Sequence, residues 1–370
     1  MNLRRLRSQF WRLDFWTLTA TLALAGIGMA FIYSAGYRGE DQPVSPFFSR
    51  QIVWTAVGLS CLVFVAMSDY RAIGEQAGWL YLFGVVLLVL VLLVGVKVYG
   101  AYRWLNFFGI RVQPSEFGKL AAILLLARYL ARPDVDPQRP ACIFGAALIA
   151  GPGFILILVE PDLGSALMLV PVAVAMLFAA GIPFRSLGIM ALGGLVTAPF
   201  GWFALGDYQR ERVLVFLDPS RDPLGSGWNK IQSAIAVGSG GWSGKGFCEG
   251  AQNVLGFLPR TVAPTDFIFS VIAEETGFVG SMAVLGLFAL VFLGGIRAAI
   301  RAPDKFGQIL ATGLTTLLFA HVFVNIAMTI GLLPITGLPL PLISYGGSFM
   351  VATMLALGLL QSVYVRRYTP

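Results

Sequence analysis

The sequence predicts an all-α polytopic membrane protein with about ten transmembrane helices and one large outer loop between the seventh and eighth helices. Three observations predict it: 57% of the 370 residues are hydrophobic, only 12% are charged, and long apolar runs recur along the chain. Average soluble domains contain about 45–50% apolar and about 25% charged residues. We therefore expect lipid to solvate much of the surface of this protein.

Ten apolar segments are candidates for transmembrane helices, since a bilayer core of about 30 Å needs roughly 20 apolar residues per helix. The first follows a basic N-terminus without a small-residue cleavage site, so it is interpreted as a retained helix rather than a signal peptide. Together they predict a single membrane domain, residues 1–370. The segments are about 14–35, 50–67, 76–96, 112–130, 141–159, 163–181, 186–205, 266–296, 306–332 and 342–365.

The basic residues orient these segments and explain the net charge of +7. Cytoplasmic loops carry an excess of Lys and Arg, and most basic residues fall on the predicted inner segments, beginning with Arg4, Arg5, Arg7 and Arg12. Both termini are therefore expected in the cytoplasm, with membrane lipids and not nucleic acid as the partner of this charge. The short outer segments carry only Arg38, Arg50, Lys97, Arg103 and Arg111.

No pattern in the sequence predicts a zinc site, a disulfide framework or a nucleotide-binding loop. The three cysteines, Cys61, Cys142 and Cys248, lie far apart without ligand spacing, and there is a single histidine. Free thiols are expected instead. The glycine-rich run 238–246 fails the phosphate-loop pattern, because Gly246 stands where Ser or Thr is required. Backbone turns are expected there.

Two irregular segments are expected to enclose a cavity on the outer side. Residues 206–265 form the large outer loop, and loops longer than about 15 residues are usually functional. Its stretch 229–239 is amphipathic, which predicts a partly helical lid. Residues 333–348, rich in Pro and Gly, join the last two spans and include Ser344 and Tyr345. Irregular backbone at membrane depth is tolerated only where it is buried or lines a wet cavity.

Charges inside the predicted spans are the first candidate site. A charged side chain at mid-membrane costs about 2.5–3.5 kcal/mol on insertion scales. Such a residue is therefore a candidate for a functional role. Glu116 and Lys119 are three residues apart, so they share a helix face and can pair, and Gln113 precedes their helix. They are either a structural ion pair or a polar wall of a substrate cavity. His321 and Asn325 share a face of another helix, where a buried hydrogen-bonded pair is expected.

Asp266 begins the eighth predicted span, with Thr265 as its expected N-cap. The helix dipole favours an ionised carboxylate in the first turn, and at the outer membrane edge beneath the loop such a group can act as a general base. The alternative is an ordinary acid at a helix N-terminus. Glu274 and Glu275 lie about two turns deeper, and at least one of them is expected to be paired.

Basic residues also gather on the outer side, against the general trend. Arginine suits bidentate contacts with phosphate, so the cluster indicates a lipid-linked phosphate or pyrophosphate, with solvated surface charge as the alternative. The cluster comprises Arg50, Arg103, Arg111, Arg210, Arg212, Arg221, Lys230, Lys245 and Arg260.

Seven segments, in the same order along the chain, resemble the SEDS family, which includes RodA, FtsW and sporulation proteins. The resemblance covers nearly the full chain. The RodA branch is favoured by IYSA at 32–35, by GAQNVLGFLP at 250–259 and by the short termini. The segments are IYSAG at 32–36, GAYRW at 100–104, QPSEFGKL at 113–120, EPDLGSAL at 160–167, DPLGSGWNKIQSAIAVGSGG at 222–241, TDFIFSVIAEETG at 265–277 and TGLPLPLISYGGS at 336–348.

The resemblance implies polymerisation of lipid II into β-1,4 glycan strands on the outer face of the cytoplasmic membrane during cell elongation. It implies Asp266 as the catalytic residue and a class B penicillin-binding protein as the partner. A divalent cation, Mg or Mn, is an open expectation, and its ligands are unknown. Candidate substrate-binding residues are Arg50, Arg103, Gln113, Glu116, Lys119, Asp162, Arg212, Ser344 and Tyr345.

The chain departs from the family pattern just before Asp266. The usual Pro-Glu and His-Thr-Asp elements are replaced here by a longer stretch, in which Arg260 stands for the acid and Pro264 for the histidine. This departure puts a role for a neighbouring histidine in doubt and leaves Asp266 untouched.

Two rival functions remain at this point. A lipid II flippase, the transporter alternative, predicts polar residues across the whole membrane thickness, whereas the informative residues here crowd the outer half. A non-catalytic scaffold predicts that changes at Asp266 are tolerated.

Overall fold

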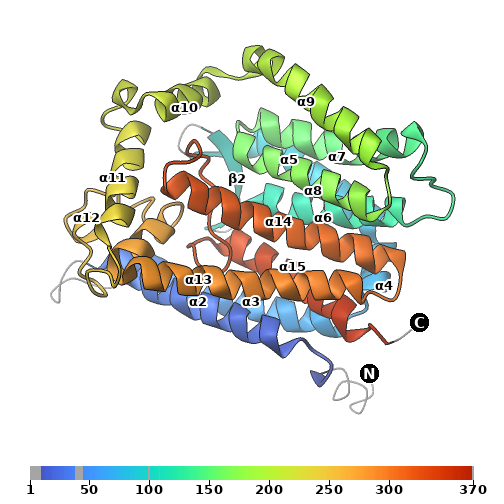
Figure 1. Ribbon diagram of the computed structural model, residues 1–370, viewed down its shortest axis with the longest axis horizontal. Coiled ribbons are helices and arrows are strands. Elements are labelled where there is room, and N and C mark those ends of the chain that lie inside the picture. Colours follow the sequence, from blue (N-terminus) through green and yellow to red (C-terminus); the bar gives the residue numbers. More distant parts are fainter. Residues whose placement is uncertain (1–9, 38–44, 99–100, 108, 369–370) are drawn as a thin grey trace.

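The computed structural model describes residues 10–37, 45–98, 101–107 and 109–368. Arg4, Arg5, Arg7 and Arg38, used above for the orientation, lie outside these residues. Figure 1 shows long helices running side by side in one bundle, with α10, α11 and α12 at one end and both chain ends at the other. The end that carries α10–α12 is called the outer end below, and the opposite one the inner end.

Ten long helices occupy the ten predicted segments. Seven of them are long and apolar enough to cross a membrane, and α8 and part of α9 are shorter apolar helices. The predicted helical membrane fold is confirmed. The helices are α2 (Phe15–Gly36), α3 (Pro46–Met67), α5 (Ala77–Val94), α6 (Pro114–Leu130), α7 (Pro140–Val159), α8 (Leu163–Ala179), α9 (Phe184–Ala204), α13 (Ile268–Ile300), α14 (Lys305–Thr329) and α15 (Gly347–Val365), with a short α4 (Tyr70–Glu75) after α3.

A small antiparallel sheet between α5 and α6 is an addition that the apolar pattern did not predict. Its strands, in the order β1-β2-β3, are β1 (Val96–Val98), β2 (Ala101–Phe107) and β3 (Ile110–Val112). These segments are rich in β-branched and aromatic residues, which favour strands. Gly109, with a φ of 86°, supplies the left-handed residue of the turn between β2 and β3.

The large outer loop is mostly helical, as predicted for the lid. It contains α10 (Asp207–Leu217), a 3₁₀ turn η1 (Pro219–Arg221), α11 (Ser226–Ser239) and α12 (Ala251–Val254). The amphipathic stretch forms α11, which lies against α13 and α14. There the Ser233 hydroxyl is 2.6 Å from that of Ser270 and donates to the Thr329 carbonyl at 2.7 Å.

A break in α13 divides it into a short outer part and a long membrane-crossing part. Gly277, with a φ of 65° and a ψ of −160°, is the non-helical residue. A Cβ there would lie 2.4 Å from the backbone nitrogen of Gly244, so the loop crosses α13 in direct backbone contact. Both acids beside the break are paired. Glu274 meets Lys245 at 2.7 Å, and Glu275 accepts from Ser34 and from the Cys248 backbone N–H.

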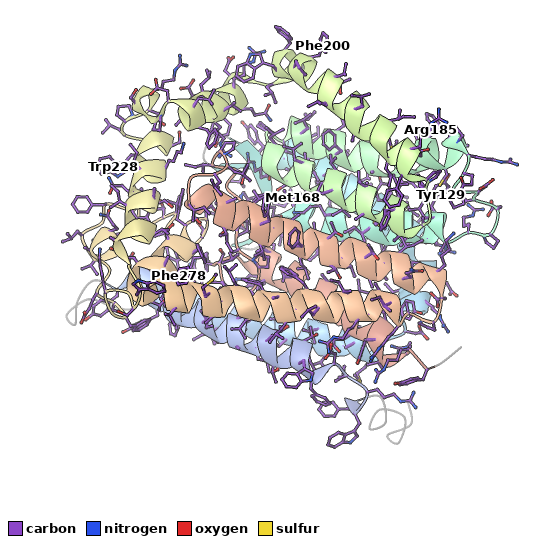
Figure 2. The ribbon with its side chains drawn as sticks, in the orientation of Figure 1. Tyr129, Met168, Arg185, Phe200, Trp228 and Phe278 are labelled. Carbon is purple, nitrogen blue, oxygen red and sulfur yellow. The ribbon has the colours of Figure 1, made fainter. Side chains whose placement is uncertain are left out.

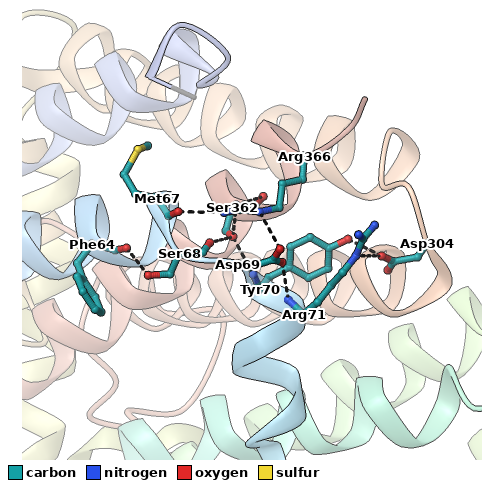
Figure 3. Close-up of polar contacts among 9 residues, drawn as sticks. All are labelled: Phe64, Met67, Ser68, Asp69, Tyr70, Arg71, Asp304, Ser362 and Arg366. Carbon is teal, nitrogen blue, oxygen red and sulfur yellow. Dashed lines mark hydrogen bonds and ion pairs between the residues drawn. The ribbon is translucent and has the colours of Figure 1, made fainter. Parts of the chain in front are cut away.

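The inner end of the bundle is held together by a polar network between α4, α14 and α15 (Figure 3). Asp304 accepts hydrogen bonds from the Tyr70 hydroxyl at 2.6 Å and from Arg71 Nε at 2.7 Å. Arg366 Nε lies 3.4 Å from Asp69 Oδ2, and the Ser362 hydroxyl donates to the Ser68 carbonyl at 2.6 Å. These contacts fix the ends of three helices to one another.

Candidate active site

Asp266 lies beneath the outer lid, two residues before the first residue of α13 and so outside the membrane-crossing helix. Its side chain keeps some exposure, yet protein surrounds it. This burial raises the pKa of the carboxyl to about 6, while the positive charge of Arg212, the Thr265 hydroxyl and the charge of Arg103 act to lower it. A carboxyl with this pKa is a competent proton acceptor near neutral pH.

The lid brings Arg212 to Asp266. Arg212 lies on α10, where its Nη1 donates to the Thr336 carbonyl at 2.9 Å and its guanidinium stacks 4.6 Å from the centre of the Tyr208 ring. Gly337 separates the two charges. A Cβ on Gly337 would lie 3.5 Å from Asp266 Oδ2 and 3.8 Å from Arg212 Nη2. The glycine leaves this space between carboxylate and guanidinium open.

A second pair of charges, Arg103 on β2 and Asp162 in the α7–α8 hairpin, lies near Asp266. Arg103 on β2 donates to the carbonyls of Glu160 and Pro161, and its Nε lies 3.8 Å from Asp162 Oδ2. Asp162 also caps α8, because it accepts from the Ser165 backbone N–H at 3.1 Å and from the Ser165 hydroxyl at 2.9 Å. The charges of Arg103 and Asp162 both act on the pKa of Asp266. The hairpin and Arg103 therefore contribute to the electrostatic environment of Asp266.

Glu160 in this hairpin was not among the residues predicted from the sequence. Its side chain is fully buried, and neither carboxyl oxygen has a hydrogen-bond partner among the described residues. Burial, reinforced by the negative charge of Asp162, raises the pKa of Glu160 to about 8, and the charge of Arg103 opposes this shift. Glu160 is thus mostly protonated at neutral pH and is able to donate a hydrogen bond.

The predicted pair of Glu116 and Lys119 is present and has a third member. Lys119 Nζ lies 3.0 Å from Glu116 Oε1 and 3.1 Å from His321 Nε2, and all three side chains are buried. An ammonium can only donate, so His321 Nε2 accepts and the ring proton is assigned to Nδ1. That Nδ1 has no partner among the described residues.

The main chain around Asp266 is fixed by the Pro- and Gly-rich segment and by α14. Asn325 Nδ2 donates to the Asp266 carbonyl at 2.9 Å and to the Leu338 carbonyl at 2.7 Å. The Ser344 hydroxyl donates to the Thr265 carbonyl. His321 and Asn325 therefore do not form the mutual pair expected from their spacing. Each reaches a different part of the site from the same face of α14.

Comparison with known proteins agrees with this geometry. The family model for cell cycle proteins of the FtsW, RodA and SpoVE type matches residues 15–369. The chain belongs to this family, the SEDS proteins. It is 40% identical to the Escherichia coli K12 peptidoglycan glycosyltransferase MrdB over 98% of this chain and 96% of that protein. It is 33% identical to the Treponema pallidum peptidoglycan glycosyltransferase RodA, with 96% of this chain and 98% of that protein covered.

Solved structures show the same fold. A structure described under the words "Structural coordination of polymerization and crosslinking by a peptidoglycan synthase complex" matches with a TM-score of 0.79 and 33% identity, covering 97% of this chain and 99% of that one. An aspartate-to-alanine mutant of the Thermus thermophilus rod shape determining protein RodA matches with a TM-score of 0.72 and 29% identity, covering 97% and 99%.

The remaining candidates of this SEDS chain lie around the site without a common contact. Arg50 is exposed in the first turns of α3, and its side chain makes no hydrogen bond or ion pair with another described residue. The Gln113 backbone N–H donates to the Ser348 hydroxyl at 3.0 Å. The Tyr345 ring lies with its centre 4.8 Å from that of Phe47, at an interplanar angle of 60°. Their roles in substrate binding stay predictions.

The described residues do not form a protein-held metal site. In that part of the chain, no group of three or more His, Cys, Asp or Glu side chains is arranged to hold a metal ion. Asp162 is already engaged by Ser165 and lies beside Arg103. The site offers two carboxyls with raised pKa values, Asp266 and Glu160, and the positive charges of Arg212 and Arg103 act on Asp266. This combination suits acid–base chemistry on a substrate that carries negative charge.

Proposed function

We propose that this chain is a peptidoglycan glycosyltransferase that polymerises lipid II into β-1,4 glycan strands on the outer face of the cytoplasmic membrane during cell elongation. One observation carries the proposal. Asp266 lies under a helical lid at the outer end of a membrane bundle, with its pKa raised to about 6 and Arg212 across the space left by Gly337. Family membership and the names of the relatives support it.

In the proposed reaction, Asp266 acts as the general base of an inverting transfer. Its carboxylate takes the proton from the 4-hydroxyl of the acceptor N-acetylglucosamine as that oxygen forms a bond to the anomeric carbon of the donor muramyl unit. The bond from that carbon to the lipid pyrophosphate breaks, and the pyrophosphate leaves with the electron pair. Base assistance of this kind contributes roughly 10²–10⁴-fold.

Arg212 and Arg103 are proposed to bind the departing pyrophosphate. Guanidinium groups match phosphate oxygens in bidentate geometry, and fixed positive charge in an enclosed site stabilises charge that develops in the transition state. The buried Glu116, Lys119 and His321 would form the deeper polar wall, where the unpartnered His321 Nδ1 is free to donate to a sugar oxygen.

The distribution of polar groups favours this reaction over lipid II transport. The Asp266, Arg212 and Glu160 groups lie at the outer end, whereas the polar groups around Asp304 at the inner end are paired with one another (Figure 3). A transported headgroup needs a polar path through both halves. The flippase alternative would require the inner network to separate in every cycle.

The chain is a multi-pass inner-membrane protein, and we propose that both termini are cytoplasmic. The described chain ends lie together, since Arg367 Nη1 donates to the Arg12 carbonyl at 2.7 Å. We also propose a class B penicillin-binding protein as the partner. The support is the similar structure whose description names polymerisation and crosslinking by a synthase complex.

The decisive experiment is polymerisation of purified lipid II by the wild type and by Asp266→Ala, each with the cognate penicillin-binding protein. We expect moenomycin-resistant glycan from the wild type and none from a folded mutant. Equal activity of the two proteins would show that Asp266 is not the base. Chelation and re-addition of Mg or Mn in the same assay test the divalent cation, and unchanged activity after chelation would remove it from the proposal.

A further inference from the structure

Figure 1 shows the two chain ends close together at one corner of the inner end. Three segments that carry an arginine reach this corner. Arg12 precedes α2, Arg301 ends α13 and Arg367 follows α15. Arg367 Nη1 donates to the Arg12 carbonyl at 2.7 Å and to the Tyr364 carbonyl at 2.8 Å. Arg301 Nη1 donates to the Tyr364 hydroxyl at 3.3 Å. Arg301 and Arg367 thus contact the same tyrosine with their side chains, and the main-chain carbonyl of Arg12 joins them.

Within the described part of the chain, no carboxylate lies within 4.0 Å of any of these three guanidiniums. Asp14, the acid of this corner, is buried and already paired with Arg297 at 3.2 Å. Other arginines at the inner end do have acids, such as Arg71 with Asp304. The three positive charges of the corner are therefore not neutralised by the described side chains.

The corner is also prearranged for an anion. The Arg367 guanidinium stacks 4.0 Å from the centre of the Tyr364 ring and 4.7 Å from that of Tyr368, and its buried Nε has no partner among the described atoms. Hydrogen bonding and charge from Arg367, reinforced by Arg301 and Arg12, lower the pKa of the Tyr368 phenol. The corner thus favours added negative charge.

Exposed aromatic side chains place this corner at the depth of lipid headgroups. Trp11 is 70% and Trp16 68% exposed, and Phe10 and Phe15 beside them are also exposed. Trp residues are enriched at the level of the headgroups in membrane proteins. A soluble acidic partner would have no need of this belt, whereas a lipid phosphate would lie directly against it.

We propose that Arg12, Arg301 and Arg367 bind the phosphate of an anionic phospholipid from the inner leaflet. The guanidiniums contact the phosphate oxygens, and the acyl chains lie along the exposed apolar faces of α2 and α13. Basic pockets between helices on the cytoplasmic side are suited to such headgroups. This site lies at the opposite end of the bundle from Asp266 and does not depend on the proposed reaction.

The test compares lipid binding by the full chain and its variants in neutral detergent, with native mass spectrometry used to measure retained phosphatidylglycerol and phosphatidylcholine. The key variant carries Arg12→Gln, Arg301→Gln and Arg367→Gln together. Because each arginine near an anionic lipid surface contributes roughly fivefold, we expect its apparent affinity for phosphatidylglycerol to fall on the order of 100-fold. If the triple variant does not fold, the single variant Arg301→Gln takes its place, because the Arg301 side chain is exposed. Its apparent affinity for phosphatidylglycerol is expected to fall about fivefold.

Two controls keep the test specific. Arg185→Gln removes an exposed arginine at the start of α9, away from the two chain ends (Figure 2), and is expected to bind phosphatidylglycerol as the wild type does. Replacing the three arginines with lysine keeps the charge and is expected to retain most of the binding. The proposal is overturned if the triple Gln variant binds like the wild type, if Arg185→Gln is equally impaired, or if inorganic phosphate displaces the lipid at equal concentration, which would indicate a free-anion site.

Discussion

The two polar clusters at opposite ends of the bundle use the same kinds of residue but differ in how completely their atoms are paired. At the inner end, Asp304 receives hydrogen bonds from Tyr70, from Arg71 and from the Gly307 backbone N–H. At the outer end, both oxygens of Glu160 and the Nδ1 of His321 are buried without a described partner. The inner cluster is complete by itself, and the outer one is not.

The difference indicates which cluster is built for stability and which for a ligand. A buried polar group without a partner costs about 1–3 kcal/mol, so such groups persist where substrate or water completes them. The pKa values follow the same division. Burial acts to raise the pKa of Asp304, but hydrogen bonds from Tyr70, Gly307 and Arg71 outweigh it and the pKa is lowered. For Asp266 burial wins, and the pKa is raised to about 6.

The largest expected effect comes from making the same change at both ends. Asp266→Asn should lower the rate of lipid II polymerisation by roughly 10²–10⁴-fold without lowering the unfolding temperature in detergent. Asp304→Asn should cost about 1 kcal/mol of stability, since its ion pair with Arg71 is about one-third exposed, and should leave the rate per folded molecule unchanged. If the two variants exchanged these effects, the division between the clusters would be wrong.

A smaller effect, on stability, is expected within the outer half. Lys119→Met leaves the buried Glu116 without its cation, and breaking a buried pair in this way costs about 3–5 kcal/mol. Adding Glu116→Gln removes the unpaired charge, so the double variant should recover much of the unfolding temperature. Its polymerisation rate should remain low if the pair also orients substrate. Full recovery of both would show that the pair is structural only, which is the alternative left open by its spacing.

The sequence predicted those features that depend on local pattern. Apolar runs of membrane length predicted all ten long helices, the i, i+3 spacing predicted that Glu116 and Lys119 pair, and the amphipathic stretch predicted α11. The same pattern could not predict the β-sheet, because β1 and β3 have only three residues each and are too short to show an alternation between two faces.

The missed features depend on tertiary contacts. Glu160 looked like part of a polar hairpin, and only the folded chain shows that its carboxyl is buried without a partner. Asn325 and His321 looked like a pair on one helix face, but their partners come from the Asp266 main chain and from α6. Side chains that bridge distant segments leave no periodic signal in a single sequence.

The smallest expected effect is a shift in pH dependence. Asp266 must be ionised to act as a base, so activity should rise with pH through a midpoint near its pKa of about 6. The positive charge of Arg212 acts to lower the pKa of Asp266. Arg212→Gln removes this charge and should therefore move the midpoint of the pH–rate profile upward, by about one pH unit. Arg212→Lys keeps the charge and should leave the midpoint near that of the wild type, although its maximal rate also falls. The midpoint of the rate profile, and not its height, is the measurement. An unchanged midpoint in Arg212→Gln would mean that the titrating group is not Asp266, and the outer cluster would then need a different base.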